Sequence, residues 1–591
     1  MIKKIYSLLD KKAKLQTYFL FIALFFRSIL DALGIGMIGP FISMIIAPNS
    51  FMSNQYVIQI TNYLGISDYS NLVIISCLAL TIFFLVKNII ASLLAFLIAR
   101  VVYMNRAIVQ RKLFLRYLNA PMNFHSNRNT AELDRNIKFE VSKVFEYFRH
   151  FFTCVNSGLL AIAILVILTL VSLESVLVIG LIVGLFGLIF IKAIGNRSAG
   201  YGKAFTETQL DINKSLDEGL RSVLELKLYN LEDFFANKFF HHARNYSEAN
   251  WKQETISVVP PLFFELVSVI ALTVLILILS SLGRELTDYV PIFAMFSFAL
   301  IRLVPNITLM LQAYQRMLYT REGVNVIFEE FNSFQEDTYD EVDANKEFSF
   351  ETINFNNVDF SHNLSSQKIL NNFNIKITKG EKIGIAGKSG SGKSTFLTIF
   401  LGLIKPDAGE ILINGDDFES LKKSFRSNVG YVQQLITLID DSIMENIIFG
   451  RSSNVQKDYD QVITALKQSN IYDFCESLED GLETSIGENG IRLSGGQRQR
   501  IGLARSLFIN PNIIILDEAT SSLDSNNEKK IIEDILSLTS KTILFSTHRI
   551  NFLEKFDKIL FFEGSGSITV GTYEELVNSS EDFRGLAENG H

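Results

Sequence analysis

Six long apolar segments dominate the first half of the chain and constrain its fold more than any other feature. They lie at 17–47, 71–99, 144–171, 173–195, 256–281 and 288–316. A helix needs about 20 apolar residues to cross the roughly 30 Å hydrocarbon core of a bilayer, and each segment reaches that length. We therefore expect residues 1–330 to form a helical transmembrane domain with six spans.

Lysine and arginine residues are distributed unevenly over the segments between these spans. The first 16 residues carry five of them and the connections 100–143 and 192–252 carry nine each, whereas the other three connections together carry one. Cytoplasmic loops are enriched in these residues, so the pattern predicts a multi-pass protein of the cell inner (plasma) membrane with both termini in the cytoplasm. The apolar run after the basic N-terminus is too long for a signal peptide and lacks a cleavage site, so we expect it to remain as an anchor.

The connections on the two sides of the membrane differ in pattern. The two long cytoplasmic ones carry helical patterns, such as NRAIVQRKLFLRYL and NKSLDEGLRSVLELKLYNLEDFF, which predict helices that continue well beyond the membrane. On the outside, YVIQITNYL is compatible with a short amphipathic helix lying at the membrane interface or with an ordinary packed loop. The sequence leaves both alternatives open.

The pattern changes after Arg321. The acidic stretch EEFNSFQEDTYDEVDANKE predicts a linker at 331–347. From 348 to 591, apolar strands such as KIGIAG and NIIILD alternate with helical segments. This alternation is typical of an α/β domain with a largely parallel sheet.

Charge and cysteine content exclude two classes of function. The net charge is −7 and no block rich in lysine and arginine occurs, which argues against a nucleic-acid-binding protein. Cys77, Cys154 and Cys475 lie far apart without metal-type spacing. We therefore expect no disulfide, no zinc site and no thiol chemistry.

A glycine-rich motif between a predicted strand and a predicted helix carries the clearest chemistry. It fits the pattern G-x-x-x-x-G-K-[ST], whose backbone N–H groups cradle phosphates. The residues expected at the nucleotide are Gly387, Ser389, Gly390, Ser391, Gly392, Lys393, Ser394 and Thr395. Lys393 should meet the β- and γ-phosphates, and the Ser394 hydroxyl should ligate Mg²⁺.

Two further motifs decide what kind of nucleotide-binding domain this is. Asp517 and Glu518 end an apolar strand, where Asp517 can hold Mg²⁺ and Glu518 can polarise an attacking water. About 20 residues earlier stands Leu-Ser-Gly-Gly-Gln at 493–497. With this signature the chain resembles the ATP-binding-cassette (ABC) transporters. The resemblance implies a multi-domain fold class: a six-helix α transmembrane domain with long cytoplasmic helical extensions, followed by an α/β P-loop ABC ATPase domain.

The resemblance assigns roles to single residues. Gln434 in YVQQ matches the glutamine that senses Mg²⁺ and the water, and His548 in STHR matches the γ-phosphate histidine. Asp524 matches a loop that touches the opposite cassette, and Glu488 matches a loop thought to sense the membrane domain. The chain departs from the family at one position, where His362 stands in place of the usual adenine-stacking tyrosine. Either His362 stacks on the base or a neighbouring aromatic residue, such as Phe360, does so.

The family also implies the assembly and the cofactors. Its members place the signature of one cassette over the nucleotide held by the other, and this chain has one of each. A homodimer with two equivalent ATP sites is therefore expected, with a heterodimer as the alternative. The expected cofactors are ATP and Mg²⁺. The residues expected to complete the partner's nucleotide site are Ser494, Gly495, Gly496 and Gln497, and the expected metal ligands are Ser394, Gln434 and Asp517.

Charged residues inside the predicted spans point to the transported substrate, because such groups are costly in a bilayer and by default mark a pathway. Arg27 and Asp31 are one turn apart, which favours an i,i+4 ion pair. Lys87 and Arg302 have no acidic residue within a turn of their own span. We expect Lys87, Arg302 and Arg27 to line a cavity for an anionic head group. The alternative is snorkelling, or pairing with Glu265.

Within the exporters, the chain looks most like the flippases of lipid-linked oligosaccharides in bacterial protein N-glycosylation. This resemblance rests on the stretch after the first span, on IFFLVKNIIAS and on LIRLVPN. It implies export of an anionic glycolipid, a polyprenyl-pyrophosphate glycan, into the outer leaflet. Alternative substrates are a lipid A-like glycolipid, then a peptide or a drug. The six spans exclude a soluble cassette ATPase, and an intact Glu518 argues against an ATP-gated channel.

Overall fold

The computed structural model of the protein describes ten stretches of the chain. These are 1–46, 48–65, 68–171, 173–281, 290–333, 348–361, 368–451, 455–519, 525–563 and 567–588. The chain divides into two compact units, one of Met1–Ala120 with Phe124–Asp337 and one of Thr338–His591 with Pro121–Asn123. Residues 334–347 of the predicted linker lie outside the described stretches.

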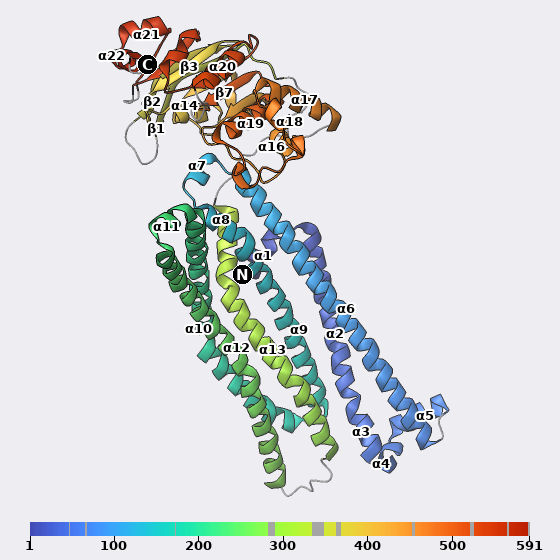
Figure 1. The fold of residues 1–591 in the computed structure, drawn as a ribbon. Helices are drawn as coiled ribbons and strands as arrows, with labels where there is room; N and C mark the ends of the chain where they lie inside the picture. The colour runs from blue at the N-terminus through green and yellow to red at the C-terminus, as the bar shows by residue number, and fades with distance from the viewer. Residues whose placement is uncertain are drawn as a thin grey trace. The chain divides into compact units, whose positions relative to one another are not determined.

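In its described residues, the N-terminal part contains helices joined by short turns and no β-strand (Figure 1). Its elements are α1 Ile2–Leu8, α2 Lys11–Gly36, α3 Ile38–Ile46, α4 Pro48–Met52, α5 Gln55–Leu64, α6 Tyr69–Leu118, α7 Met122–Ser126, α8 Thr130–Arg135, the π-helical turn η1 Asn136–Glu140, α9 Val141–Val171, α10 Leu173–Arg221, α11 Val223–Tyr229, α12 Glu232–Ser281 and α13 Val290–Asn332. Of the two alternatives left open for YVIQITNYL, the structure shows the helix, α5, which Asn54 caps by accepting a hydrogen bond from the Tyr56 N–H. Its position at a membrane interface stays a prediction.

Within the described residues, four helical stretches are long and apolar enough to cross a membrane. They are Lys11–Ile45, Tyr69–Leu118, Thr130–Thr169 and Glu232–Val274. The other two predicted spans, 173–195 and 288–316, fall on α10 and α13, which are long helices but are not among the four. The structure therefore supports a helical transmembrane domain, and the count of six spans stays a prediction.

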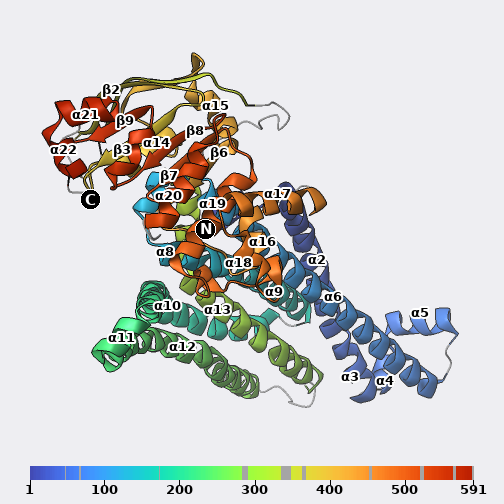
Figure 2. The same cartoon turned by 45° about the horizontal axis from the view of Figure 1, so that its top comes forward.

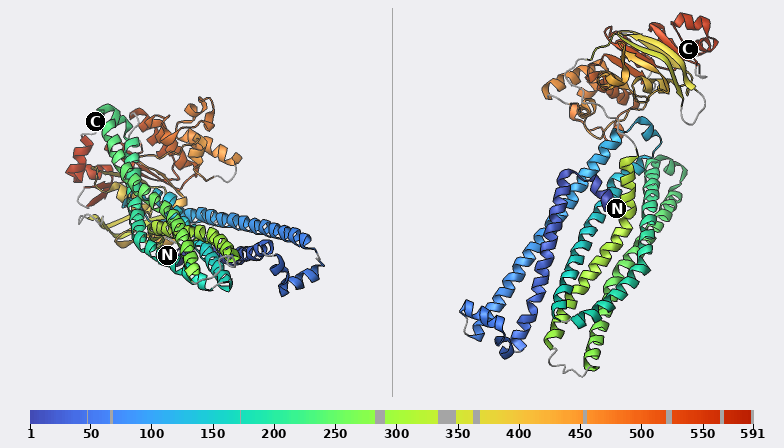
Figure 3. Two further views of the ribbon diagram at one scale, coloured as in Figure 1. Left: turned by 90° about the horizontal axis from the view of Figure 1, so that it is seen from below. Right: turned by 180° about the vertical axis from the view of Figure 1, so that it is seen from behind.

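The longest helices extend far beyond the length that a bilayer requires, as the patterns of the cytoplasmic connections predict. Helix α6 has 50 residues and α10 has 49, which corresponds to about 75 Å each at 1.5 Å per residue. α2 lies beside α6, and α10 lies beside α12, with α11 at the turn between them (Figures 1 and 3). Fully buried side chains of α2, α6, α9 and α13, such as Leu24, Leu113 and Val144, form a hydrophobic core.

The C-terminal unit contains two sheets (Figure 2). The four-stranded antiparallel sheet has the order β2–β1–β4–β5, with β1 Thr352–Ser361, β2 Lys368–Thr378, β4 Ala408–Ile413 and β5 Asp416–Asp417. The six-stranded sheet has the order β10–β9–β3–β8–β7–β6, with β3 Lys382–Gly387, β6 Val429–Val432, β7 Ile513–Asp517, β8 Thr542–Ser546, β9 Lys558–Phe562 and β10 Ile568–Gly571. In the second sheet only β10 is antiparallel to its neighbour.

The central strands explain why this sheet forms. Every residue of β3, β7 and β8 is buried, which is typical of parallel strands covered by helices on both faces. The helices of this unit are α14 Lys393–Phe400, α15 Phe418–Ser427, α16 Ile443–Ile448, α17 Val455–Gln468, α18 Tyr472–Glu476, α19 Gly495–Phe508, α20 Ser525–Leu536, α21 Tyr573–Ser579 and α22 Glu581–Glu588, with short 3₁₀ turns at Gly481–Glu483, Glu488–Gly490 and Ile550–Lys555. The carboxyl ends of β3, β6, β7 and β8 therefore lie at one edge, where ligands of such sheets bind.

Candidate nucleotide site and membrane charges

The predicted phosphate loop lies between β3 and α14 and requires glycine at two positions. Gly387 has φ +149°, and a Cβ there would lie 2.6 Å from the carbonyl oxygen of Phe562. Gly392 has φ +106°, and its Cβ would lie 2.4 Å from Ile369 Cγ2. A side chain at either position would disturb the loop, because L-residues rarely adopt these φ values and the space is filled.

Lys393 is held inside this loop. Its Nζ donates to the carbonyl oxygens of Gly387 at 2.8 Å and Lys388 at 3.2 Å, and the side chain is buried. Burial lowers the pKa of the Lys393 ammonium, and the nearby carboxylates of Glu518 and Asp517 oppose this shift. A phosphate anion at this loop would favour the charged form in the same way.

Asp517 ends β7 and is buried beside the ends of two other strands. Tyr431 of β6 donates a hydrogen bond to Asp517 Oδ2 at 3.4 Å, and Ser546 of β8 is its register partner. Burial raises the pKa of the Asp517 carboxyl. Among the described residues, Oδ1 has no hydrogen-bond partner, so this oxygen is available to a cation.

The three predicted metal ligands fit Mg²⁺ chemically. Ser394, Gln434 and Asp517 supply hydroxyl, amide and carboxylate oxygens, the hard donors that Mg²⁺ prefers. Bound Mg²⁺ would supply charge neutralisation for nucleotide phosphates at this strand edge. The unpartnered Oδ1 of Asp517 supports the fit.

Glu518 stands at the centre of the polar contacts at this strand edge. Gln434 Nε2 donates to Glu518 Oε2 at 2.7 Å, His548 Nε2 pairs with Oε1, and Lys393 Nζ lies 3.8 Å from Oε1. The Glu518 backbone has φ +50°, in the left-handed region. This conformation is held by a hydrogen bond from the Glu518 N–H to the Ser546 carbonyl oxygen at 3.1 Å. A carboxylate so placed can accept a proton from a water molecule at the phosphate loop.

The signature residues form the start of α19 and are engaged with one another. Ser494 caps the helix by accepting from the Gln497 N–H at 3.3 Å, and the Gln497 side chain accepts from the Ser494 N–H at 2.8 Å. Gly495 and Gly496 follow at the helix N-terminus, where N–H groups favour anions. Among the described contacts, none joins Ser494 or Gln497 to Lys393 or Glu518.

In the membrane part, the structure shows an ion-pair partner of Lys87 that the sequence does not reveal. Lys87 Nζ lies 2.7 Å from Asp31 Oδ1 and 4.8 Å from the centre of the Phe84 ring, and the side chain is 6% exposed. The expected Arg27–Asp31 pair is confirmed at 3.6 Å, but it is part of a triad that joins α2 to α6. Lys87 is therefore not an unpaired cation, because its partner lies on a different span. Arg302 is exposed on α13, three residues before Pro305.

Comparison with known families identifies both parts of the chain. The ABC transporter family matches residues 370–521, and the ABC transporter transmembrane region matches residues 18–302. The protein is an ABC transporter. It contains a transmembrane domain and an ATPase domain, so it is an ATP-hydrolysing, multi-pass membrane exporter.

Individual relatives of this ABC transporter differ in how much of it they match. The ATP-dependent lipid A-core flippase of Francisella tularensis subsp. tularensis (strain FSC 198) is 27% identical over 81% of this chain and 79% of its own. The glutathione/L-cysteine transport system ATP-binding/permease protein CydD of Bacillus subtilis (strain 168) is 43% identical over 40% of each chain. A solved bacterial Atm1-family ABC exporter with ATP bound shares the fold, with a TM-score of 0.77 and 21% identity over 98% of this chain and 99% of that one.

Several predicted site residues of the ABC transporter are not tested by this geometry. His362 and Asp524 lie outside the described residues. Phe360, the alternative adenine-stacking residue, is 5% exposed in the core of the antiparallel sheet, so its ring is not available to a base. Glu488 lies in the 3₁₀ turn Glu488–Gly490.

Sequence reasoning missed the residues that hold the segment after Gln434. A Cβ at Gly502 of α19 would lie 2.4 Å from Ile436 Cδ1, so glycine permits this close packing. Arg505 of α19 donates to the Thr437 carbonyl oxygen at 2.8 Å and to the Asn446 carbonyl oxygen at 2.7 Å. Burial, with a smaller effect of Arg451, lowers the pKa of Arg505 to about 10. The sequence indicates that Gly502 and Arg505 lie on a helix through its periodicity, but this periodicity does not show which residues they contact.

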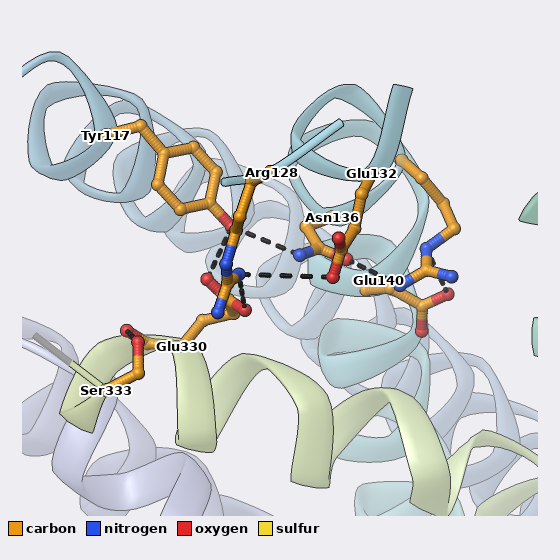
Figure 4. A network of polar contacts seen from close by, with 8 residues as sticks. Tyr117, Arg128, Glu132, Asn136, Glu140, Glu330 and Ser333 are labelled. Atoms are coloured by element: carbon orange, nitrogen blue, oxygen red, sulfur yellow. Dashed lines mark hydrogen bonds and ion pairs between the residues drawn. The ribbon is translucent and has the colours of Figure 1, made fainter. Parts of the chain in front are cut away.

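A second polar cluster of the ABC transporter links α6, the segment before α9 and the end of α13 (Figure 4). Glu330 accepts hydrogen bonds from the Tyr117 hydroxyl at 3.0 Å and from Arg128. Asn136 Nδ2 donates to the same Tyr117 oxygen at 3.2 Å. The buried carboxylate of Glu330 therefore joins three segments that are far apart in the sequence.

Proposed function

We propose that this exporter moves a lipid-linked oligosaccharide, a polyprenyl-pyrophosphate glycan, from the cytoplasmic to the outer leaflet of the inner membrane. The observation that carries the proposal is the Arg27–Asp31–Lys87 triad. Two cations and one carboxylate leave one net positive charge inside predicted spans, which is costly unless an anion compensates it. Arg302 adds a further exposed cation on α13. The sequence resemblance to PglK, a flippase of such glycolipids, supports the same substrate.

In this proposal, ATP hydrolysis at the cassette drives alternating access of the transmembrane domain. Glu518 acts as the general base on the attacking water, while Gln434 and His548 orient the water and the γ-phosphate. Lys393 binds the phosphates, and Ser394, Gln434 and Asp517 hold Mg²⁺. The contacts of Glu518 with Gln434, His548 and Lys393 support these roles.

We infer that the working unit is a homodimer. One chain supplies one phosphate loop and one signature, and among the described contacts these do not meet. The turn between α10 and α12 also exposes a group of large apolar side chains, a feature that marks protein interfaces. The group comprises Leu220 at 67%, Leu224 at 77%, Leu228 at 67% and Phe234 at 63% exposure. A second copy of the chain would cover such a surface.

A lipid A-like glycolipid is the second candidate substrate. The observation in its favour is the lipid A-core flippase of Francisella tularensis, which matches 81% of this chain, including its membrane part. Both candidates carry phosphate groups next to apolar chains, so the same cations serve either one. A flipping assay with both glycolipids separates them.

The test replaces Lys87 and Arg302 together by glutamine. In this variant Asp31 keeps Arg27 as its ion-pair partner, so its carboxylate is not left unpaired. Expression and basal ATPase activity should therefore stay at the wild-type level. Flipping of a polyprenyl-pyrophosphate glycan in reconstituted vesicles should be lost. Arg244→Gln, which removes an exposed cation paired with Glu248, is the matched control. Normal flipping by the double variant would contradict the proposal and favour a neutral substrate.

A further inference from the structure

The position of His548 beside Glu518 depends on the backbone that carries it, because the His548 side chain is 45% exposed. Its Nε2 pairs with Glu518 Oε1. His548 stands in the chain between β8 and the 3₁₀ turn Ile550–Lys555, labelled η5. On its N-terminal side, the Thr547 N–H donates to the carbonyl oxygen of Ile385 in β3 at 3.1 Å, which attaches this residue to the central sheet. What holds the C-terminal neighbour of His548 therefore also determines where the imidazole lies.

That neighbour, Arg549, is anchored to a helix from another part of the chain. Its N–H donates to the Thr547 hydroxyl at 3.0 Å. Its side chain donates through Nη1 to Glu528 Oε2 and forms an ion pair with this carboxylate. Glu528 lies in the first turn of α20, 21 positions before Arg549. The ion pair thus joins the residue that follows His548 to the start of α20.

The two partners of this ion pair are buried to different degrees. The Glu528 side chain is 2% exposed, whereas that of Arg549 is 46% exposed. A buried carboxylate is costly unless a cation or hydrogen bonds compensate it, so Glu528 constrains where the Arg549 guanidinium lies. A pair in which both partners are exposed constrains its residues less, because water competes for both charges. The charged end of Arg549 is therefore tied to a fixed point of the cassette.

A second ion pair between α20 and η5 provides a comparison within the same molecule. Lys555, at the end of η5, donates to Glu533 of α20 at 2.9 Å. Both of these side chains are exposed, at 62% for Lys555 and 46% for Glu533. Lys555 stands seven positions after His548, whereas Arg549 is its immediate neighbour. The two pairs therefore separate the attachment of η5 to α20 from the placement of His548.

We propose that Glu528 is a positioning residue for ATP hydrolysis. It acts through Arg549 and holds the loop that carries His548, so that His548 Nε2 stays beside Glu518. The inference rests on the role proposed for His548 at the γ-phosphate, and it adds a residue that acts through its neighbour. Placement of this kind affects the rate strongly, because a displacement of about 1 Å caused by a distant substitution can lower a rate about 10²-fold.

The first experiment measures kcat and KM for ATP with the purified full-length transporter in lipid nanodiscs. Glu528→Gln keeps the shape of the side chain and leaves no buried charge, and the exposed Arg549 remains accessible to water. We expect kcat to fall about tenfold. KM for ATP should change by less than about twofold, because Lys393 and the phosphate loop are intact. Glu533→Gln, the matched control, removes the second ion pair between the same elements and should keep the wild-type kcat.

The second experiment separates positioning from a purely structural role. In a His548→Ala background, Glu528→Gln should lower kcat by less than about twofold, because the residue that it positions is absent. A structural role predicts the same loss of about tenfold in both backgrounds. Single-turnover release of labelled phosphate measures the low rates, and thermal unfolding of the same preparations reports whether the variants fold. If Glu528→Gln does not fold, Glu528→Gln with Arg549→Gln replaces it, because this double variant leaves neither charge without its partner.

Three results would overturn the inference. They are a wild-type kcat of Glu528→Gln, an equal loss of kcat in Glu533→Gln, and a further loss of about tenfold on adding Glu528→Gln to His548→Ala. Failure of the proposed function looks different. Wild-type hydrolysis by His548→Ala would refute the role of His548 itself. Loss of hydrolysis in His548→Ala together with wild-type hydrolysis by Glu528→Gln would refute the positioning by Glu528 alone.

Discussion

Three single substitutions at Glu518 separate the role of its carboxylate from the energetic cost of its backbone conformation. Glu518 has φ +50°, a conformation that costs an L-residue about 1–2 kcal/mol. Glu518→Gln removes the charge and keeps the shape. Glu518→Ala and Glu518→Gly both remove the side chain, and they differ in whether the left-handed backbone is free of strain.

The expected magnitudes follow from these two effects. Loss of a general base lowers the rate about 10²- to 10⁴-fold, so all three variants should retain at most about one per cent of wild-type ATP hydrolysis. ATP binding should persist, because Lys393 and the loop remain. At an ordinary position glycine is about 0.5–1 kcal/mol less stable than alanine. At position 518 the order should reverse, with Glu518→Gly more stable than Glu518→Ala by about 1 kcal/mol after the two effects are combined.

The assay combines ATP turnover with thermal unfolding of the same detergent-purified preparations. Filter binding of labelled ATP reports whether the nucleotide is still held. Wild-type turnover by Glu518→Gln would refute the assignment of the base. If Glu518→Ala were more stable than Glu518→Gly by the usual margin, the left-handed conformation would not be a constraint on this residue.

Three further predictions test other features. Dilution of the detergent-solubilised protein to monomers should abolish ATP hydrolysis if two copies share each ATP site. Light scattering would follow the dissociation, and a constant specific activity during it would contradict the homodimer. Glu330→Gln leaves Arg128 without its buried carboxylate partner and should lower the free energy of unfolding by about 1–3 kcal/mol. The control variant Glu329→Gln changes an exposed neighbouring residue and should change the free energy of unfolding by less than about 0.5 kcal/mol. Equal unfolding temperatures of the two variants would argue against a stabilising role of the Glu330 cluster. Burial raises the pKa of Cys475 to about 11, so its thiol stays protonated at pH 8 and iodoacetamide should modify it only after denaturation, as peptide mass spectrometry would show.

Motifs whose chemistry is local in the sequence could be predicted in detail. The phosphate loop follows a buried strand and precedes a helix, so Gly387 to Thr395 were placed from the sequence alone. Asp517 ends β7 and Gln434 follows the end of its parallel neighbour β6, and the topology of such sheets brings strand ends to one edge. The signature could be recognised from its letters, although the capping box of Ser494 and Gln497 required the structure.

Contacts between distant segments could not be predicted in this way. The sequence shows that Lys87 has no acidic residue within a turn of its own span, but a single chain does not reveal that α2 presents Asp31 to α6. The same limit applies to Arg149 and Arg316, which are 167 positions apart in the sequence and line one cavity. The left-handed backbone conformation of Glu518 could not be predicted for a different reason, because glutamate does not usually adopt this conformation.

The ion pair between Lys87 and Asp31 also bears on how the protein enters the membrane. Asp31 and Arg27 reach the bilayer first and neutralise each other within one helix. Lys87 arrives on the next predicted span, and its charge is costly until it meets Asp31. Its partner is already in place at that moment, so the first two spans can leave the insertion machinery as a paired unit. Lys87 thus has an acidic partner before the later spans insert, although the triad of Arg27, Asp31 and Lys87 keeps one net positive charge.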